Sequence, residues 1–276
     1  MSTTTPYTSP IPVRRAHLGD ALASEWTKIR SLRSTMWTLG VMIVVVTGIG
    51  ALLALAVAAV DNGGEYSARQ GSVLELGMVG MLLGSVCVIT LGVLTITSEH
   101  STGMIRTTLT ACPSRGRVLA AKSIVFFLLV FSLTTAVGGL VALAQTAIIG
   151  TSGAATAEHW FRATVGVGVF MALLGLFSLA VGAVLRHSAG AITTMIGLVL
   201  LPFVLALSLY GESLATLRET LIEYSIPSLM AVLYSGGSAD PTGVGVPSGW
   251  QPLWILLGVT AVALGGAYVS LARRDV

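Results

Sequence analysis

Charged side chains are scarce in this chain of 276 residues. Lys, Arg, Asp and Glu together make up 10% of the sequence, whereas hydrophobic residues make up 54%. Soluble domains carry charge on about a quarter of their residues, and the mean hydropathy here is +0.88. One water-soluble core of this size cannot hide so much apolar surface. The composition therefore excludes a soluble domain and predicts an integral membrane protein.

Cysteine and histidine are also few, with two and four residues. Cys87 lies in an apolar run and Cys112 in a basic loop, so we expect no disulfide between them. The histidines are scattered over loops and the ends of apolar runs. The sequence therefore predicts no metal site and no redox centre.

Catalytic motifs are missing as well. There is no HExxH sequence and no GxSxG sequence. The nearest approach to a phosphate-binding loop is the segment 116–123, where Ala121 stands in place of the second glycine that lets backbone amides approach phosphate. We therefore expect that the chain is not an enzyme, hydrolyses no ATP by itself and binds no cofactor.

Six apolar runs are long enough to cross a membrane, which takes about 20 helical residues. They do not alternate as barrel strands do, and backbone groups in lipid must be hydrogen-bonded internally. The sequence thus predicts an all-α protein with six transmembrane helices. Their predicted bounds are 36–60, 73–97, 123–149, 163–185, 191–210 and 252–272, and the break before the fifth span rests on Arg186, His187 and Gly190.

The fifteen basic residues are divided unevenly between alternate loops. Twelve fall in the two terminal segments and in the loops after spans two and four, and the other three are Arg69, Arg162 and Arg218. Lys and Arg near span ends resist translocation. We therefore expect both termini to be cytoplasmic, and this distribution is a topology signal that does not favour nucleic-acid binding.

The chain before the first span divides into two parts. Residues 1–16 are rich in Ser, Thr and Pro and are predicted to form a disordered cytoplasmic tail. Residues 17–35 are predicted to form an amphipathic helix at the membrane interface, with Trp26 at headgroup depth; a cytoplasmic helix packed on protein is the alternative. Residues 36–276 then form a single six-span domain. The apolar stripe of the helix comprises Leu18, Leu22, Trp26 and Ile29, and the basic residues expected towards lipid are Lys28, Arg30 and Arg33.

The longest outer loop, 211–251, contains a helical repeat of apolar residues that Pro227 interrupts. It predicts two short helices in the outer leaflet before span six.

Within the spans, Gly80 and Gly84 are four positions apart, a spacing of small residues that lets two helices approach closely. They are candidates either for helix packing or for the translocation path. Gln145 is a polar residue inside a span and is a functional candidate for that reason.

Two segments flanking the first two spans resemble the ABC-2 type transporter permease family, in particular its actinobacterial-style members. They are SEWTKIRSLRSTMW (24–37) and TSEHSTGMIRTTLTACPSRGRVLAAK (97–122). The most specific local feature is the spacing of Glu99, Gly103 and Arg106. Family members often carry an aromatic residue where this chain has His100. The resemblance extends over the whole layout of the chain.

The resemblance implies the membrane subunit of an ABC exporter in the bacterial plasma membrane. Such permeases pair as homo- or heterodimers and dock on separate ATPase subunits, which bind ATP and Mg. The interfacial helix and the loop after span two are the contact elements, which here include a cytoplasmic coupling helix. The residues implied in coupling are Glu99, Gly103, Arg106, Arg115 and Arg117. An intramolecular salt bridge or a membrane-edge anchor is the alternative for Glu99 and Arg106.

The absence of deep charge favours a hydrophobic or amphipathic substrate, as in multidrug, antibiotic or lipid efflux. A secondary transporter is one alternative, although the ionisable groups and internal repeats typical of that class are missing. A membrane enzyme, or another membrane protein without transport function, is the other.

Overall fold

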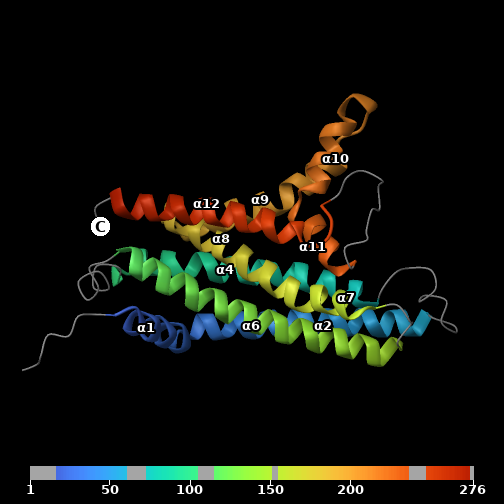
Figure 1. Cartoon of the computed structure of the whole chain (residues 1–276), viewed down its shortest axis with the longest axis horizontal. Coiled ribbons are helices and arrows are strands. Elements are labelled where there is room, and N and C mark those ends of the chain that lie inside the picture. The colour runs from blue at the N-terminus through green and yellow to red at the C-terminus, as the bar shows by residue number, and fades with distance from the viewer. Residues whose placement is uncertain (1–16, 61–72, 105–114, 151–154, 236–246, 274–276) are drawn as a thin grey trace, which may run out of the picture.

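The computed structural model describes residues 17–60, 73–104, 115–150, 155–235 and 247–273. Every regular element in these residues is helical, and six helices are long and apolar enough to cross a membrane. The helices run side by side as one elongated bundle (Figure 1). The predicted tail, residues 1–16, and Arg106 lie outside the described residues.

The six spans follow the predicted order. They are α2 (Arg33–Val60), η1 (Val73–Leu76) continued by α4 (Gly77–Ser101), α6 (Arg115–Ile149), α7 (Ala157–Phe161) continued by η2 (Arg162–Gly166) and α8 (Val167–Leu185), α9 (Ser188–Ser208), and α12 (Gln251–Arg273). The remaining elements are α1 (Leu18–Ser31), η3 (Glu212–Leu214), α10 (Ala215–Glu223) and α11 (Ile226–Tyr234).

Spans two and three are longer than their apolar runs. The second was predicted to end at residue 97 and the third to begin at residue 123, but α4 continues to Ser101 and α6 begins at Arg115. The backbone hydrogen bonds of a helix do not stop where hydropathy falls. As a result Glu99 and Lys122, expected in a loop, lie within helices.

The fourth span forms the centre of the bundle. Helix α8 is the most deeply buried span, and it packs against α4, α6, α12 and α9. Close approach depends on small residues: a Cβ added at Gly175 would lie 2.6 Å from Cε1 of Phe126. Helices α2, α9 and α12 are the least buried spans and lie around this centre.

The break between spans four and five lies where the sequence predicts it. Helix α8 ends at Leu185, and Arg186 takes a left-handed conformation with φ 56°. The ring of His187 then accepts a hydrogen bond from the amide of Gly190 at 3.0 Å and caps the N-terminus of α9.

The two short helices before span six are present, but they differ in burial. Helix α10 has no buried residue and projects away from the bundle in Figure 1. Helix α11 has Pro227 in its first turn, a position where proline is favoured. Its residues from Leu229 to Tyr234 are mostly buried by protein. The interruption at Pro227 is thus a helix start, and the placement of both helices in the outer leaflet stays a prediction.

Candidate functional site

Four charged side chains from three helices meet at one end of the bundle. The ammonium of Lys122 on α6 contacts Glu25 Oε2 on α1 at 2.6 Å and Glu99 Oε1 on α4 at 2.9 Å. The ammonium of Lys28 on α1 contacts Glu25 Oε1 at 2.7 Å and Glu99 Oε1 at 3.0 Å. We refer to these four residues as the charge cluster. It joins α1 to spans two and three.

Burial makes the pairing in the charge cluster obligatory. The side chains of Lys122, Glu25 and Glu99 are 2%, 3% and 8% exposed. Lys122 Nζ also lies 3.4 Å from the carbonyl oxygen of Thr95. Two carboxylates and two ammonium groups give the cluster no net charge. Removing one partner of such a buried pair leaves an uncompensated charge, at a cost of about 3–5 kcal/mol.

Helix α1 turns its charged side to the protein. Its buried residues are Glu25 and Ile29, whereas Trp26 is 49% exposed. Arg30 and Arg33 are also exposed. Of the predicted apolar stripe, Ile29 is thus buried by protein and Trp26 is exposed, and the place of Trp26 at headgroup depth stays a prediction.

Lys28 lies at the edge of the charge cluster, and its side chain is 21% exposed. Burial by itself lowers the pKa of Lys28. Hydrogen bonds and electrostatic attraction from Glu25 and Glu99 outweigh that effect, so the pKa of this ammonium is raised above its ordinary value of 10.5. Lys28, expected to face lipid with Arg30 and Arg33, thus remains charged against the bundle.

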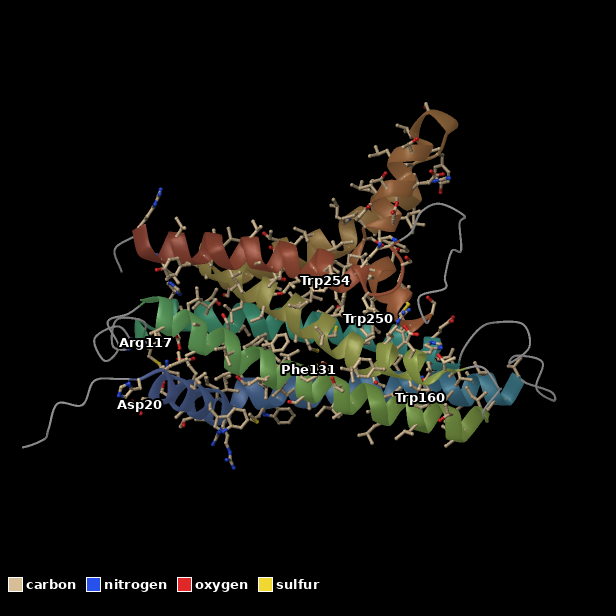
Figure 2. The ribbon with its side chains drawn as sticks, viewed as in Figure 1. Asp20, Arg117, Phe131, Trp160, Trp250 and Trp254 are labelled. Atoms are coloured by element: carbon tan, nitrogen blue, oxygen red, sulfur yellow. The ribbon has the colours of Figure 1, made fainter. Side chains whose placement is uncertain are left out.

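The remaining residues implied in ATPase coupling lie close to this end. Gly103 has φ +70° and turns the chain after α4, and no atom of the described residues lies within 4 Å of an added Cβ. Arg115 is the first residue of α6. Arg117 is exposed, and Figure 2 shows it at the same end of the bundle as Asp20 of α1. The role of these residues in ATPase contact stays a prediction.

Sequence reasoning assigned no role to Glu25 and Lys122. A signal for Lys122 was available, because it directly precedes an apolar run and a lysine in a membrane helix needs a partner. Glu25 is separated from it by 97 positions. Helical periodicity carries no information about a contact at that separation.

Gly80 and Gly84 serve packing between α4 and α2. A Cβ at Gly80 would lie 2.9 Å from the carbonyl oxygen of Val46, and a Cβ at Gly84 would lie 2.7 Å from Cγ2 of Val46. The two glycines therefore let the backbones of these spans approach closely.

Gln145 is fully buried between α6 and α2. Its Nε2 donates a hydrogen bond to the carbonyl oxygen of Gly50 at 3.3 Å. Its Oε1 has no hydrogen-bond partner among the described residues and borders a cavity of about 10 Å³, which Gly77 and Tyr234 also line. The described residues that line this small cavity include none of the residues that line the larger cavity beside the charge cluster.

The fold defines a multi-pass membrane protein with six candidate spans, and the charge cluster lies at one end of it. Residues 21–204 match the family described as ABC-2 family transporter protein, a match of 184 of the 276 residues (204 − 21 + 1). The chain therefore belongs to the ABC-2 family of transporter membrane proteins. No curated protein matches it.

Membership establishes several properties predicted from the sequence. The chain is the membrane subunit of an ABC-2 transporter, and subunits of this family lack ATPase activity. No cofactor is expected on this subunit, and the family implies an ATPase partner. The matched residues begin in α1 and end in α9, so they include all four residues of the charge cluster.

Proposed function

We propose that this chain is the permease of an ABC exporter that moves a hydrophobic or amphipathic substrate out of a bacterial cell. A separate ATPase subunit hydrolyses the ATP and docks at the end of the bundle that carries α1. The observation that carries this proposal is the charge cluster, because it ties the expected docking helix directly to two spans.

The geometry of the charge cluster supports coupling between the ATPase and the spans. Lys122 connects α1 to α4 through Glu25 and Glu99 at 2.6 and 2.9 Å. The chain between α4 and α6 starts and ends beside the same contacts. A displacement of α1 or of that connection would therefore move spans two and three together. This is what transmission from an ATPase to a permease requires.

The orientation is proposed from charge. Helix α1, the first residue of α6 and the last turn of α12 lie at one end of the bundle (Figure 1). Among the described residues, most of the basic ones belong to helix ends at this end, whereas Trp160 and Trp250 lie towards the other end (Figure 2). By the positive-inside rule the α1 end is cytoplasmic, and the ATPase docks there.

The substrate class is proposed from the apolar faces of the outer spans. Large hydrophobic side chains are exposed along α2, α9 and α12; examples are Val44, Leu52, Leu201, Val204, Trp254 and Val262. Pairing with a second permease subunit, identical or different, would turn part of this surface into a hydrophobic seam. A substrate that crosses along such a seam is apolar or amphipathic.

The proposal is tested by purifying the chain from its native membrane in mild detergent and assaying the eluate for ATPase activity. We expect an ATPase to co-elute. Arg106→Ala combined with Arg117→Ala removes two coupling residues outside the charge cluster and should reduce co-elution and stimulated hydrolysis.

Arg218→Ala on α10 is the matched control, because it removes one arginine from the opposite end of the bundle. It should leave co-elution unchanged. An eluate without ATPase would contradict the proposal and favour a secondary transporter. Equal loss in the control would contradict docking at the α1 end.

A further inference from the structure

A cavity of about 530 Å³ opens beside the charge cluster, between α1, α2 and α4. It lies along the last turns of α4 and the first turns of α2. Leu94, Thr95 and Ser98 on its wall are half-buried. The volume falls within the range of about 300–1,000 Å³ that small-molecule sites occupy. Because the apolar runs of both spans end here, the cavity is expected at the depth of lipid headgroups.

On the α4 side of the cavity, the hydroxyl hydrogens of the lining residues are already donated. The hydroxyls of Thr95 and Ser98 donate to the carbonyl oxygens of Leu91 and Leu94, each at 2.6 Å. The hydroxyl of Thr102 donates to the carbonyl oxygen of Ser98 at 2.7 Å. A hydroxyl has one hydrogen and two lone pairs. The oxygen atoms of this wall can therefore accept further hydrogen bonds but cannot donate them.

Glu99 adds a charged acceptor to the same wall. Both lysines of the charge cluster contact its Oε1, at 3.0 and 2.9 Å. Its Oε2 accepts no hydrogen bond from any residue in the described part of the chain. Lys28 lines the cavity with a partly exposed ammonium. The wall therefore offers several acceptors and one cation at its edge.

Ile29, Leu32, Leu91 and Leu94 give the cavity an apolar part. The first turns of α2 add the hydroxyl groups of Ser34, Thr35 and Thr38. A ligand that matches this wall has a donor-rich cation, an anion close to that cation, and a hydrocarbon part.

We propose that the cavity binds a membrane lipid whose headgroup carries a primary ammonium and a phosphate, the chemistry of phosphatidylethanolamine. The ammonium donates to Glu99 Oε2 and to the hydroxyl oxygens of Thr95 and Ser98. The phosphate lies against Lys28, and the acyl chains leave past Leu94 into the leaflet on the α1 side. The site does not depend on transport or on an ATPase partner, so it stands apart from the proposed function.

The choice among lipids follows from hydrogen bonding. A choline headgroup carries a quaternary nitrogen with no N–H, so it leaves these acceptors unsatisfied. A phosphatidylglycerol headgroup brings a negative charge to a neutral cluster and offers no cation. Hydrogen bonds that involve an ionised group are stronger than neutral ones, and the loss of one should weaken binding about tenfold.

The experiment measures lipid binding to the purified full chain by native mass spectrometry. The headgroup series is phosphatidylethanolamine, its N-methyl and N,N-dimethyl forms, and phosphatidylcholine, all with the same acyl chains. We expect affinity to fall about tenfold for each hydrogen bond that is lost, with the weakest binding for phosphatidylcholine. Equal binding across the series, or stronger binding of phosphatidylglycerol, would overturn the proposal.

Substitutions on α4 localise the site. Leu94→Trp fills the cavity and should abolish the preference, whereas Leu83→Trp, at a residue 47% exposed on the same helix, should retain it. Thr95→Val removes one acceptor oxygen at nearly constant volume and should reduce the preference even if Leu94→Trp folds poorly. A preference unchanged in both Leu94→Trp and Thr95→Val would overturn the location.

A soluble competitor separates a lipid site from a site for a free zwitterion. Glycerophosphoethanolamine carries the headgroup without acyl chains, and we expect no displacement of lipid by it. Displacement at equal concentration would overturn the assignment to a membrane lipid. None of these measurements involves an ATPase, so their failure is distinguishable from failure of the proposed function.

Discussion

Replacing Lys122 by Met should destabilise the protein strongly. The substitution keeps a long side chain but removes an ammonium that contacts Glu25 at 2.6 Å and Glu99 at 2.9 Å in a site where its side chain is 2% exposed. The charge cluster then holds two carboxylates and only Lys28. The expected loss is about 3–5 kcal/mol in the free energy of unfolding, the cost of breaking a buried pair on one side.

The loss should appear as a lower unfolding temperature. For chains of roughly this size 1 kcal/mol corresponds to about 2–4 °C, so Lys122→Met should lower the midpoint by roughly 6–20 °C. Tryptophan fluorescence in a fixed detergent measures it. Arg117→Met is the matched control on the same helix, because Arg117 is exposed. An exposed ion pair contributes about 0–1 kcal/mol, so the effect of this control should stay within about 1 kcal/mol.

A double mutant tests the charge argument itself. Glu99→Gln combined with Lys122→Met removes one charge of each sign and restores neutrality to the charge cluster. It should be more stable than the sum of the single effects predicts, with a coupling energy of about 1–3 kcal/mol. Additive losses, or a loss in Lys122→Met no larger than in Arg117→Met, would refute the reasoning.

Three further predictions concern other residues. The pKa of Lys28 is raised in the folded protein, so its ammonium stabilises the fold fully at pH values below the ordinary pKa of 10.5. This stabilisation is lost as pH rises through the higher folded-state pKa. The difference in melting temperature between wild type and Lys28→Met should therefore be constant near neutral pH and shrink above about pH 10.5. Gly80→Val should lower the free energy of unfolding, measured by thermal unfolding, by about 1–3 kcal/mol, because its Cβ would meet the backbone of Val46. Gly139→Val should lower it less, because no described residue lies within 4 Å of a Cβ added there. Gln145→Met should change the free energy of unfolding by less than about 1.5 kcal/mol, since it removes a buried unpaired oxygen together with one hydrogen bond. Reduced transport in this variant at unchanged stability would identify Gln145 as part of the translocation path.

The fold was largely predictable from hydropathy. Six apolar runs predicted six long helices in the correct order, and Arg186 and His187 predicted the break between α8 and α9. The prediction worked because a membrane imposes one dominant length and one composition on each span. The helix ends were less accurate, because charged residues such as Glu99 continue a helix beyond its apolar run.

The charge cluster was beyond sequence reasoning. Glu99 was selected through a family resemblance, with an intramolecular salt bridge left as an alternative, and the structure does give it ion pairs with Lys28 and Lys122. The role of Glu25 depends on how α1 is rotated. The pairing of Glu25 with Lys122, 97 positions away, cannot be derived from the periodicity of α1.

The central position of α8 sets different rules for sequence change in different parts of this permease. On α8, side-chain volume is the limit, since a Cβ at Gly175 would meet Phe126 at 2.6 Å. On the outward faces of α9 and α12, residues such as Leu201 and Val262 are exposed in the single chain, so exchange of one apolar side chain for another there leaves the packing around α8 unchanged. Under the proposed function, the cargo range could therefore change by such exchanges while the centre that holds the outer helices stays constant.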